Sequence, residues 1–158
     1  MTNAASHRGA AAIGQLADLP PIEALSVCLL RSWCDGHRDQ INRDFANALG
    51  PDAARRAAAT LAEICTLCAR QGRRPLMRHG MTCSCLGADE ACFATLIAAG
   101  ADGQREDAMM LAALIVRVEM APLLANLAID FGMSLRRFCL RTRNDSQTSH
   151  AGAAATLH

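Results

Sequence analysis

Residues 51–71 read PDAARRAAATLAEICTLCARQ, and the helical period of this stretch indicates the fold class. A proline opens it and Gly72 comes directly after it, which is the usual punctuation of a helix with proline in its first turn and glycine after its last. The apolar residues recur at steps of three and four, as on one face of a helix. They are Ala54, Ala57, Ala58, Leu61, Ile64, Cys65 and Cys68. A helix with such a face needs other helices to cover it.

The same period and punctuation recur on both sides of this stretch. Gly36, Gly50 and Gly100 each come after an apolar periodic segment, and Gly132 with Ser134 reads as a stop and then an N-cap. No segment alternates as a strand would. The predicted helices span about residues 20–35, 41–49, 51–71, 89–99, 104–116, 122–131 and 134–141. We therefore expect an all-α single domain, a compact bundle of six or seven helices.

The two ends of the chain differ from its middle. Residues 1–17 are rich in Ala, Ser and Gly, and residues 144–158 read NDSQTSHAGAAATLH. Neither segment has a sustained apolar period, so burial offers little to offset the entropy of ordering. We expect disordered tails at 1–17 and 144–158 around a helical domain at 18–143, which is long enough to form one core.

Composition excludes several chemistries. All sixteen basic residues are Arg, there is no Tyr, and the net charge is +1. Without Lys the chain has no Walker A lysine, Schiff base or catalytic lysine, and it contains no GxGxxG, HExxH or GxSxG motif. Heavy use of Arg and Ala, which have GC-rich codons, indicates a bacterium with a high-GC genome. An enzyme ranks below a binding or regulatory protein.

The eight cysteines bear on the compartment. The N-terminus lacks a basic start with an apolar run after it, so we expect no signal peptide, a cytoplasmic location and reduced thiols. The longest apolar run, 108–116, is half the length of a membrane span, and Arg117, Glu119 and Asp130 interrupt the apolar residues beyond it. The sequence predicts no membrane partner.

A cysteine and histidine cluster occupies the middle of the chain. The segment CTLC (65–68) precedes RHGMTCSC (78–85), in a long irregular stretch at 73–87. Thiolates and imidazole suit a soft or borderline metal, so Cys83, Cys85 and His79, with Cys65 and Cys68, are candidate ligands of zinc or iron, or a redox site. The alternative is that Cys65 and Cys68 are small core residues, because they lie on the apolar face of their helix.

The C-x2-C pair on a helix also resembles the alkylhydroperoxidase-like family, an all-α fold. In that family a C-x2-C-x3-H motif, supported by an upstream Glu, performs thiol redox chemistry. Here Gly72 occupies the His position, and Glu63 lies close to Cys65. The resemblance therefore implies a thiol pair without the family's proton relay.

Basic residues crowd the end of the 51–71 helix and the loop after it. A phosphate or carboxylate could be held by Arg70, Arg73, Arg74 and Arg78. The alternative is that these residues complement the helix dipole and keep the loop solvated.

A second candidate site lies near the C-terminus, where residues 122–143 read PLLANLAIDFGMSLRRFCLRTR. Ala128, Gly132, Met133 and Ser134 resemble the helix-turn-helix unit of AraC-type regulators, whose pattern is A-x3-G-M-S-x3-L. The patterns differ afterwards, because that family continues L-x-R-x-F and this chain does not. The resemblance implies base contacts or phosphate contacts from Leu135, Arg136, Arg137, Arg141 and Arg143.

These observations are compatible with three functions. The first is a cytoplasmic bacterial accessory or regulatory protein whose Cys/His loop binds a metal or senses redox state. The second is a DNA-binding regulator that uses residues 122–143. The third is a non-catalytic adaptor, for which a protein partner or a homodimer is compatible with the sequence. The middle of the chain also resembles small helical proteins of alphaproteobacteria, which implies a fold class alone.

Overall fold

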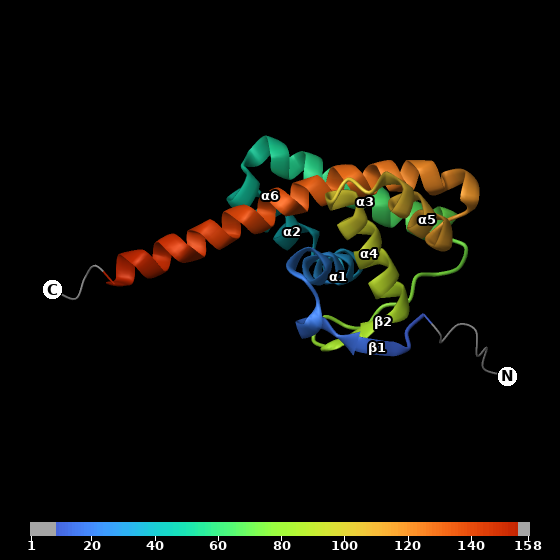
Figure 1. Ribbon diagram of the computed structural model, residues 1–158, viewed down its shortest axis with the longest axis horizontal. Helices are drawn as coiled ribbons and strands as arrows, with labels where there is room; N and C mark the ends of the chain where they lie inside the picture. Colours follow the sequence, from blue (N-terminus) through green and yellow to red (C-terminus); the bar gives the residue numbers. More distant parts are fainter. Residues whose placement is uncertain (1–8, 155–158) are drawn as a thin grey trace.

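The computed structural model describes residues 9–154, and the outer parts of both predicted tails, residues 1–8 and 155–158, lie outside this range. Six α-helices account for most of the described chain, so the predicted all-α single domain is confirmed (Figure 1). The helices are α1 (Pro21–Cys34), α2 (Arg38–Leu49), α3 (Pro51–Gln71), α4 (Ala88–Ala101), α5 (Arg105–Ile115) and α6 (Ala121–Ala154).

The predicted helix punctuation is confirmed at two glycines. Gly36 and Gly50 have positive φ angles, a conformation that glycine adopts without strain, and they separate α1 from α2 and α2 from α3. Helix α3 buries the predicted apolar face, with Ala54, Leu61 and Ile64 in the core. The 3.6-residue period therefore located this helix and its packed side.

Helix α4 lies in the middle of the bundle, between α1, α5 and α6 (Figure 1). It is apolar on nearly all sides, as a fully surrounded helix should be. Phe93, Leu96 and Ile97 are fully buried. Two glycines allow α4 and α6 to cross closely: a Cβ on Gly100 would overlap the Ala128 carbonyl oxygen, and one on Gly132 would overlap the Ala101 nitrogen.

The predicted break at Gly132 is wrong, because residues 121–154 form the single helix α6. Gly132 has no positive φ, so it makes no turn. Its lack of a side chain serves helix packing instead. The sequence alone does not distinguish a glycine that permits a close helix crossing from a glycine that permits a turn. Only the partner, here Ala101, distinguishes them.

Helix α6 extends well beyond the body of the bundle (Figure 1). Its first half packs into the core through Leu124, Phe131 and Leu135, whereas residues 140–149 are exposed. The segment Val118–Ser149 is long and apolar enough, by length and composition, to span a membrane, and 39% of its most apolar window is buried. Much of that apolar character comes from residues of α6 that pack in the core. Residues 144–149, predicted as a disordered tail, are helical.

A small antiparallel ribbon was missed by the periodicity argument. Strand β1 (Ala12–Gln15) pairs with β2 (Cys85–Gly87), and a 3-10 turn, Leu16–Asp18, leads from β1 towards α1. Both strands are too short to establish an alternating pattern. The ribbon ties part of the predicted N-terminal tail to the loop that carries Cys83 and Cys85, so that part of the prediction is wrong.

Candidate functional site

The loop from Arg73 to Cys85, whose last residue begins β2, is held against the bundle by a buried ion pair. Arg31 on α1 and Glu90 in the first turn of α4 are 1% and 0% exposed, and the Arg31 Nε lies 2.7 Å from the Glu90 Oε1. A buried ion pair is favourable only when its geometry is good and its other hydrogen bonds are made. Both conditions hold here.

All five N–H groups of the Arg31 guanidinium have acceptors. Two of them reach the Glu90 carboxylate, with the second bond, Nη2 to Oε2, at 2.9 Å. The other three donate to backbone carbonyls of the loop: Gly80 at 3.1 Å, Cys83 at 2.6 Å and Cys85 at 2.7 Å. One side chain therefore fixes the backbone on both sides of the C-x-C motif.

The Glu90 carboxylate holds the loop from the other direction. It accepts hydrogen bonds from the backbone N–H of His79 at 3.0 Å and from that of Gly87, the N-cap of α4, at 2.9 Å. Burial acts to raise the pKa of Glu90, but the bonds from Arg31, Gly87 and His79 together lower that pKa below its ordinary value. Glu90 is thus a buried charged residue in the first turn of α4.

The sequence did carry a signal for this pair. Arg31 lies on the buried face of α1 with Val27 and Leu30, and Glu90 lies on the buried face of α4 with Phe93. One basic and one acidic residue on apolar faces of two different helices indicate a buried pair, because isolated charges are too costly to bury.

The loop brings together His79, Cys83 and Cys85, the three loop residues predicted as a site. The Cys83 Sγ lies 3.7 Å from the His79 Nδ1, within hydrogen-bond range for sulfur. The turn that makes this possible is closed by the Cys83 N–H, which donates to the Gly80 carbonyl at 3.1 Å. All three side chains are partly exposed. An imidazole against a thiol is the arrangement that activates cysteine as a nucleophile.

Cys85 is the second thiol of this site. Its pKa is raised by its interaction with the neighbouring Cys83 thiol, against opposing contributions from Gln15 and Arg31. Because the thiolate is the nucleophilic form, the raised pKa favours Cys85 as the second thiol to react.

The far nitrogen of His79 is a further feature of the site. Nε2 is buried and has no hydrogen-bond partner among the described residues. The adjacent ring carbon, Cδ2, would lie 3.2 Å from a Cβ at Gly87, so the ring edge packs against that glycine. Unpaired buried nitrogens are uncommon, and a catalytic or redox role is one of their explanations.

Cys65 and Cys68 do not join this site. They are 4% and 5% exposed in the core of α3, and burial raises the pKa of both thiols, that of Cys68 to about 12. Across residues 9–154, no three His, Cys, Asp or Glu side chains are placed to hold a metal ion. The predicted five-residue ligand set is therefore not assembled, because the period that placed Cys65 and Cys68 on the apolar face also buries them.

Three of the four arginines predicted as an anion site have protein partners. Arg74 pairs with Asp89 at 2.7 Å, Arg78 pairs with Asp35 at 2.7 Å, and Arg73 donates to the Ala113 carbonyl at 3.1 Å. Arg70 is exposed on α3. The loop arginines thus tie the loop to α1, α4 and α5, and they do not converge on one point.

The residues predicted to contact DNA are dispersed along α6. Leu135 is fully buried, Arg136 pairs with Asp102, and Arg141 lies 3.4 Å from the Ala48 carbonyl. Arg137 and Arg143 are exposed. The turn on which the helix-turn-helix resemblance depended is absent, although DNA binding itself stays a prediction.

Comparison with known protein families, with curated proteins and with solved structures finds no match.

Proposed function

We propose that the loop at 79–85 is a redox-responsive dithiol site, in which Cys83 reacts first and Cys85 second. The observation that carries the proposal is the contact of the Cys83 Sγ with the His79 Nδ1 at 3.7 Å, with the carbonyls of Cys83 and Cys85 held by the same guanidinium. The imidazole is placed to take the Cys83 proton as the sulfur attacks.

The reaction we propose is exchange with a small disulfide. The Cys83 thiolate attacks one sulfur of R–S–S–R, the S–S bond breaks, and one R–S⁻ leaves and takes up a proton. The Cys85 thiolate then attacks the Cys83 sulfur of the mixed disulfide and displaces the second R–S⁻. Two thiols of the protein are oxidised to one disulfide, and the small disulfide is reduced to two thiols.

The held backbone supports this assignment. Arg31 bonds the carbonyls of both Cys83 and Cys85, so the two thiols are presented from a fixed backbone and not from a freely moving loop. Cys85 is also the first residue of β2 and pairs with Gln15 of β1. A change of oxidation state at Cys85 is thereby coupled to the ribbon, as a regulatory protein that senses redox state would require.

Cysteine variants treated with oxidised glutathione test the proposal. In the wild type we expect a Cys83–Cys85 disulfide, identified by peptide mapping after the free thiols are alkylated. Cys85→Ser should stop at glutathione attached to Cys83, and Cys83→Ser should lose the linkage. His79→Gln should slow the first step by about tenfold or more.

Cys28→Ser is the matched control, because Cys28 is an exposed thiol of α1. It should react at Cys83 and Cys85 as the wild type does. Glutathione on Cys28 or Cys34 with Cys83 unmodified would overturn the proposal, as would equal rates in the wild type and His79→Gln.

A further inference from the structure

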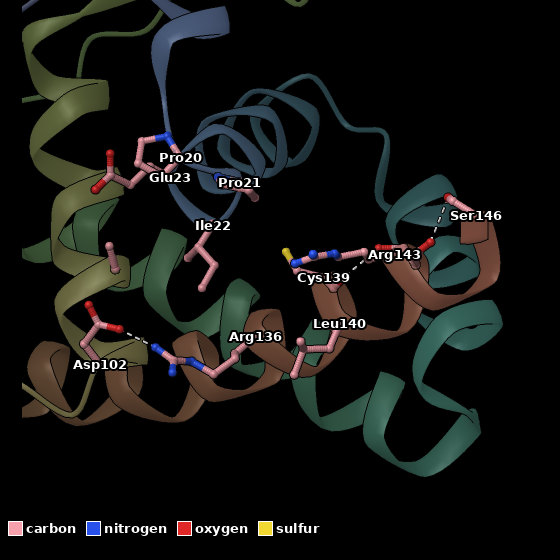
Figure 2. Close-up of a pocket in the computed structure, with 12 residues that line it drawn as sticks. Pro20, Pro21, Ile22, Glu23, Asp102, Arg136, Cys139, Leu140, Arg143 and Ser146 are labelled. Atoms are coloured by element: carbon pink, nitrogen blue, oxygen red, sulfur yellow. Dashed lines mark hydrogen bonds and ion pairs between the residues drawn. The ribbon is translucent and has the colours of Figure 1, made fainter. Parts of the chain in front are cut away.

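A hollow among the described residues lies where α6 leaves the bundle. Its volume is about 710 Å³, within the range of small-molecule sites. The N-terminal turn of α1, the C-terminal turn of α4 and residues 136–146 of α6 enclose it (Figure 2). It contains none of the residues of the dithiol site.

One side of this cavity is apolar. Pro20, Pro21 and Ile22 line it from the start of α1, and Leu140 lines it from α6. Leu140 is 56% exposed, although it is a large aliphatic residue beside a cavity. Further burial of these side chains by a ligand would be favourable. The surface thus favours a ligand with an apolar body.

Two guanidinium groups reach the cavity from the same face of α6. Arg136 and Arg143 are two helical turns apart, so their side chains lie along one line. Arg136 pairs with Asp102 at the cavity wall. Arg143 runs back along the cavity beside Cys139 (Figure 2), and no carboxylate of the described residues is within ion-pair distance of it. Arg143 is therefore available to a carboxylate.

The acidic residues limit the ligand's charge. Glu23 and Asp102 line the cavity on the side of α1 and α4. Asp102 is paired with Arg136, whereas Glu23 has no ion-pair partner among the described residues, so a second negative charge on the ligand would be repelled by the Glu23 carboxylate. We therefore propose that this cavity binds a monocarboxylate with an aliphatic body, its carboxylate on Arg143 and its chain against Ile22 and Leu140.

Isothermal titration calorimetry with octanoate tests this proposal, with octan-1-ol and the dicarboxylate suberate as matched probes. We expect octanoate to bind the full chain, and both other probes to bind about tenfold or more weakly. Octan-1-ol has no carboxylate to make the charge-assisted bond, and suberate adds a second, repelled negative charge. Arg143→Gln should weaken octanoate by the same factor, and Arg143→Lys should restore part of the affinity.

Arg137→Gln is the matched control, because Arg137 is exposed on α6 and does not line the cavity. It should bind octanoate as the wild type does. A second readout is alkylation of Cys139, which lines the cavity and should be protected by octanoate. The proposal is overturned by no binding at millimolar octanoate, by equal affinity for octanol, or by equal losses in Arg143→Gln and Arg137→Gln.

Discussion

Arg31 and Glu90 are the residues on which the dithiol loop depends. They join α1, α4 and the loop through hydrogen bonds that satisfy the whole guanidinium. An apolar pair of similar volume is often at least as stabilising as a buried ion pair. We infer that the charged pair is present because it fixes the backbone of Cys83 and Cys85, which an apolar pair could not do.

Replacement of Glu90 tests this role. Glu90→Gln leaves the Arg31 charge buried without its counter-charge, so we expect a loss of about 3–5 kcal/mol in the free energy of unfolding. Urea unfolding monitored by circular dichroism measures it. Glu63→Gln is the control, because Glu63 is exposed on α3, and it should change stability by less than about 0.5 kcal/mol. Equal effects of the two changes would contradict the interpretation.

The lowered pKa of Glu90 gives a pH dependence with a definite sign. The unfolded carboxyl titrates near pH 4.3, and the folded one titrates below that. Stability from Glu90 is therefore fully present above about pH 4.3 and is lost as the pH falls through the folded pKa. We expect the stability difference between the wild type and Glu90→Gln to be constant from about pH 5 to 7 and to shrink below about pH 4. A difference that grows on acidification would be incompatible with a charged, hydrogen-bonded Glu90.

At the scale of elements, the close crossing of α4 and α6 determines the path of the longest helix. Gly132 lies where a Cβ would meet backbone atoms of Ala101 and Ile97. Alanine is otherwise preferred to glycine inside a helix by about 1 kcal/mol. The packing and the helix propensity therefore act in opposite directions at this position.

We expect Gly132→Ala to destabilise the protein by about 1–3 kcal/mol, because the added methyl has no space to enter. Ser134→Ala is a nearby control, since the Ser134 hydroxyl bonds only the Asp130 carbonyl within the same helix. It should be neutral or slightly stabilising. Thermal unfolding compares the two, and a stabilised Gly132→Ala would show that the helices are not in contact there.

The two halves of α6 should differ in local stability. Residues 144–149 bury no side chain, and their Ser and Thr hydroxyls bond carbonyls of the same helix. Such a helix end has little tertiary packing to oppose opening. Hydrogen exchange should be fast at 144–149 and much slower at 124–135, where Leu124, Phe131 and Leu135 are buried. Equal protection along α6 would mean that the projecting half has a partner.

At the scale of the whole molecule, periodicity predicted the helices well because most of them bury one continuous face. The apolar stripe of α3 and the glycines after α1 and α2 are local signals. The ribbon of β1 and β2 is not, since it joins residues more than sixty positions apart in stretches of three and four residues. The close crossing at Gly132 is also not a local signal, because it depends on Ala101 of a different helix.

The candidate site was predicted in part. His79, Cys83 and Cys85 were predicted as a site because three soft ligands lie within seven positions of the sequence. The separation of Cys65 and Cys68 from them is tertiary, although their apolar helix face already favoured the core. Arg31 and Glu90 were missed, although each lies on the apolar face of its helix, because their pairing across α1 and α4 is tertiary.

Disulfide mapping by mass spectrometry tests the dithiol site, on wild-type protein equilibrated with graded ratios of reduced to oxidised glutathione. We expect a Cys83–Cys85 linkage to form first, with the loss of two hydrogen atoms, while the buried Cys65 and Cys68 are alkylated only after unfolding. Oxidation that begins at other cysteines, or that leaves Cys83 and Cys85 as free thiols throughout, would contradict it.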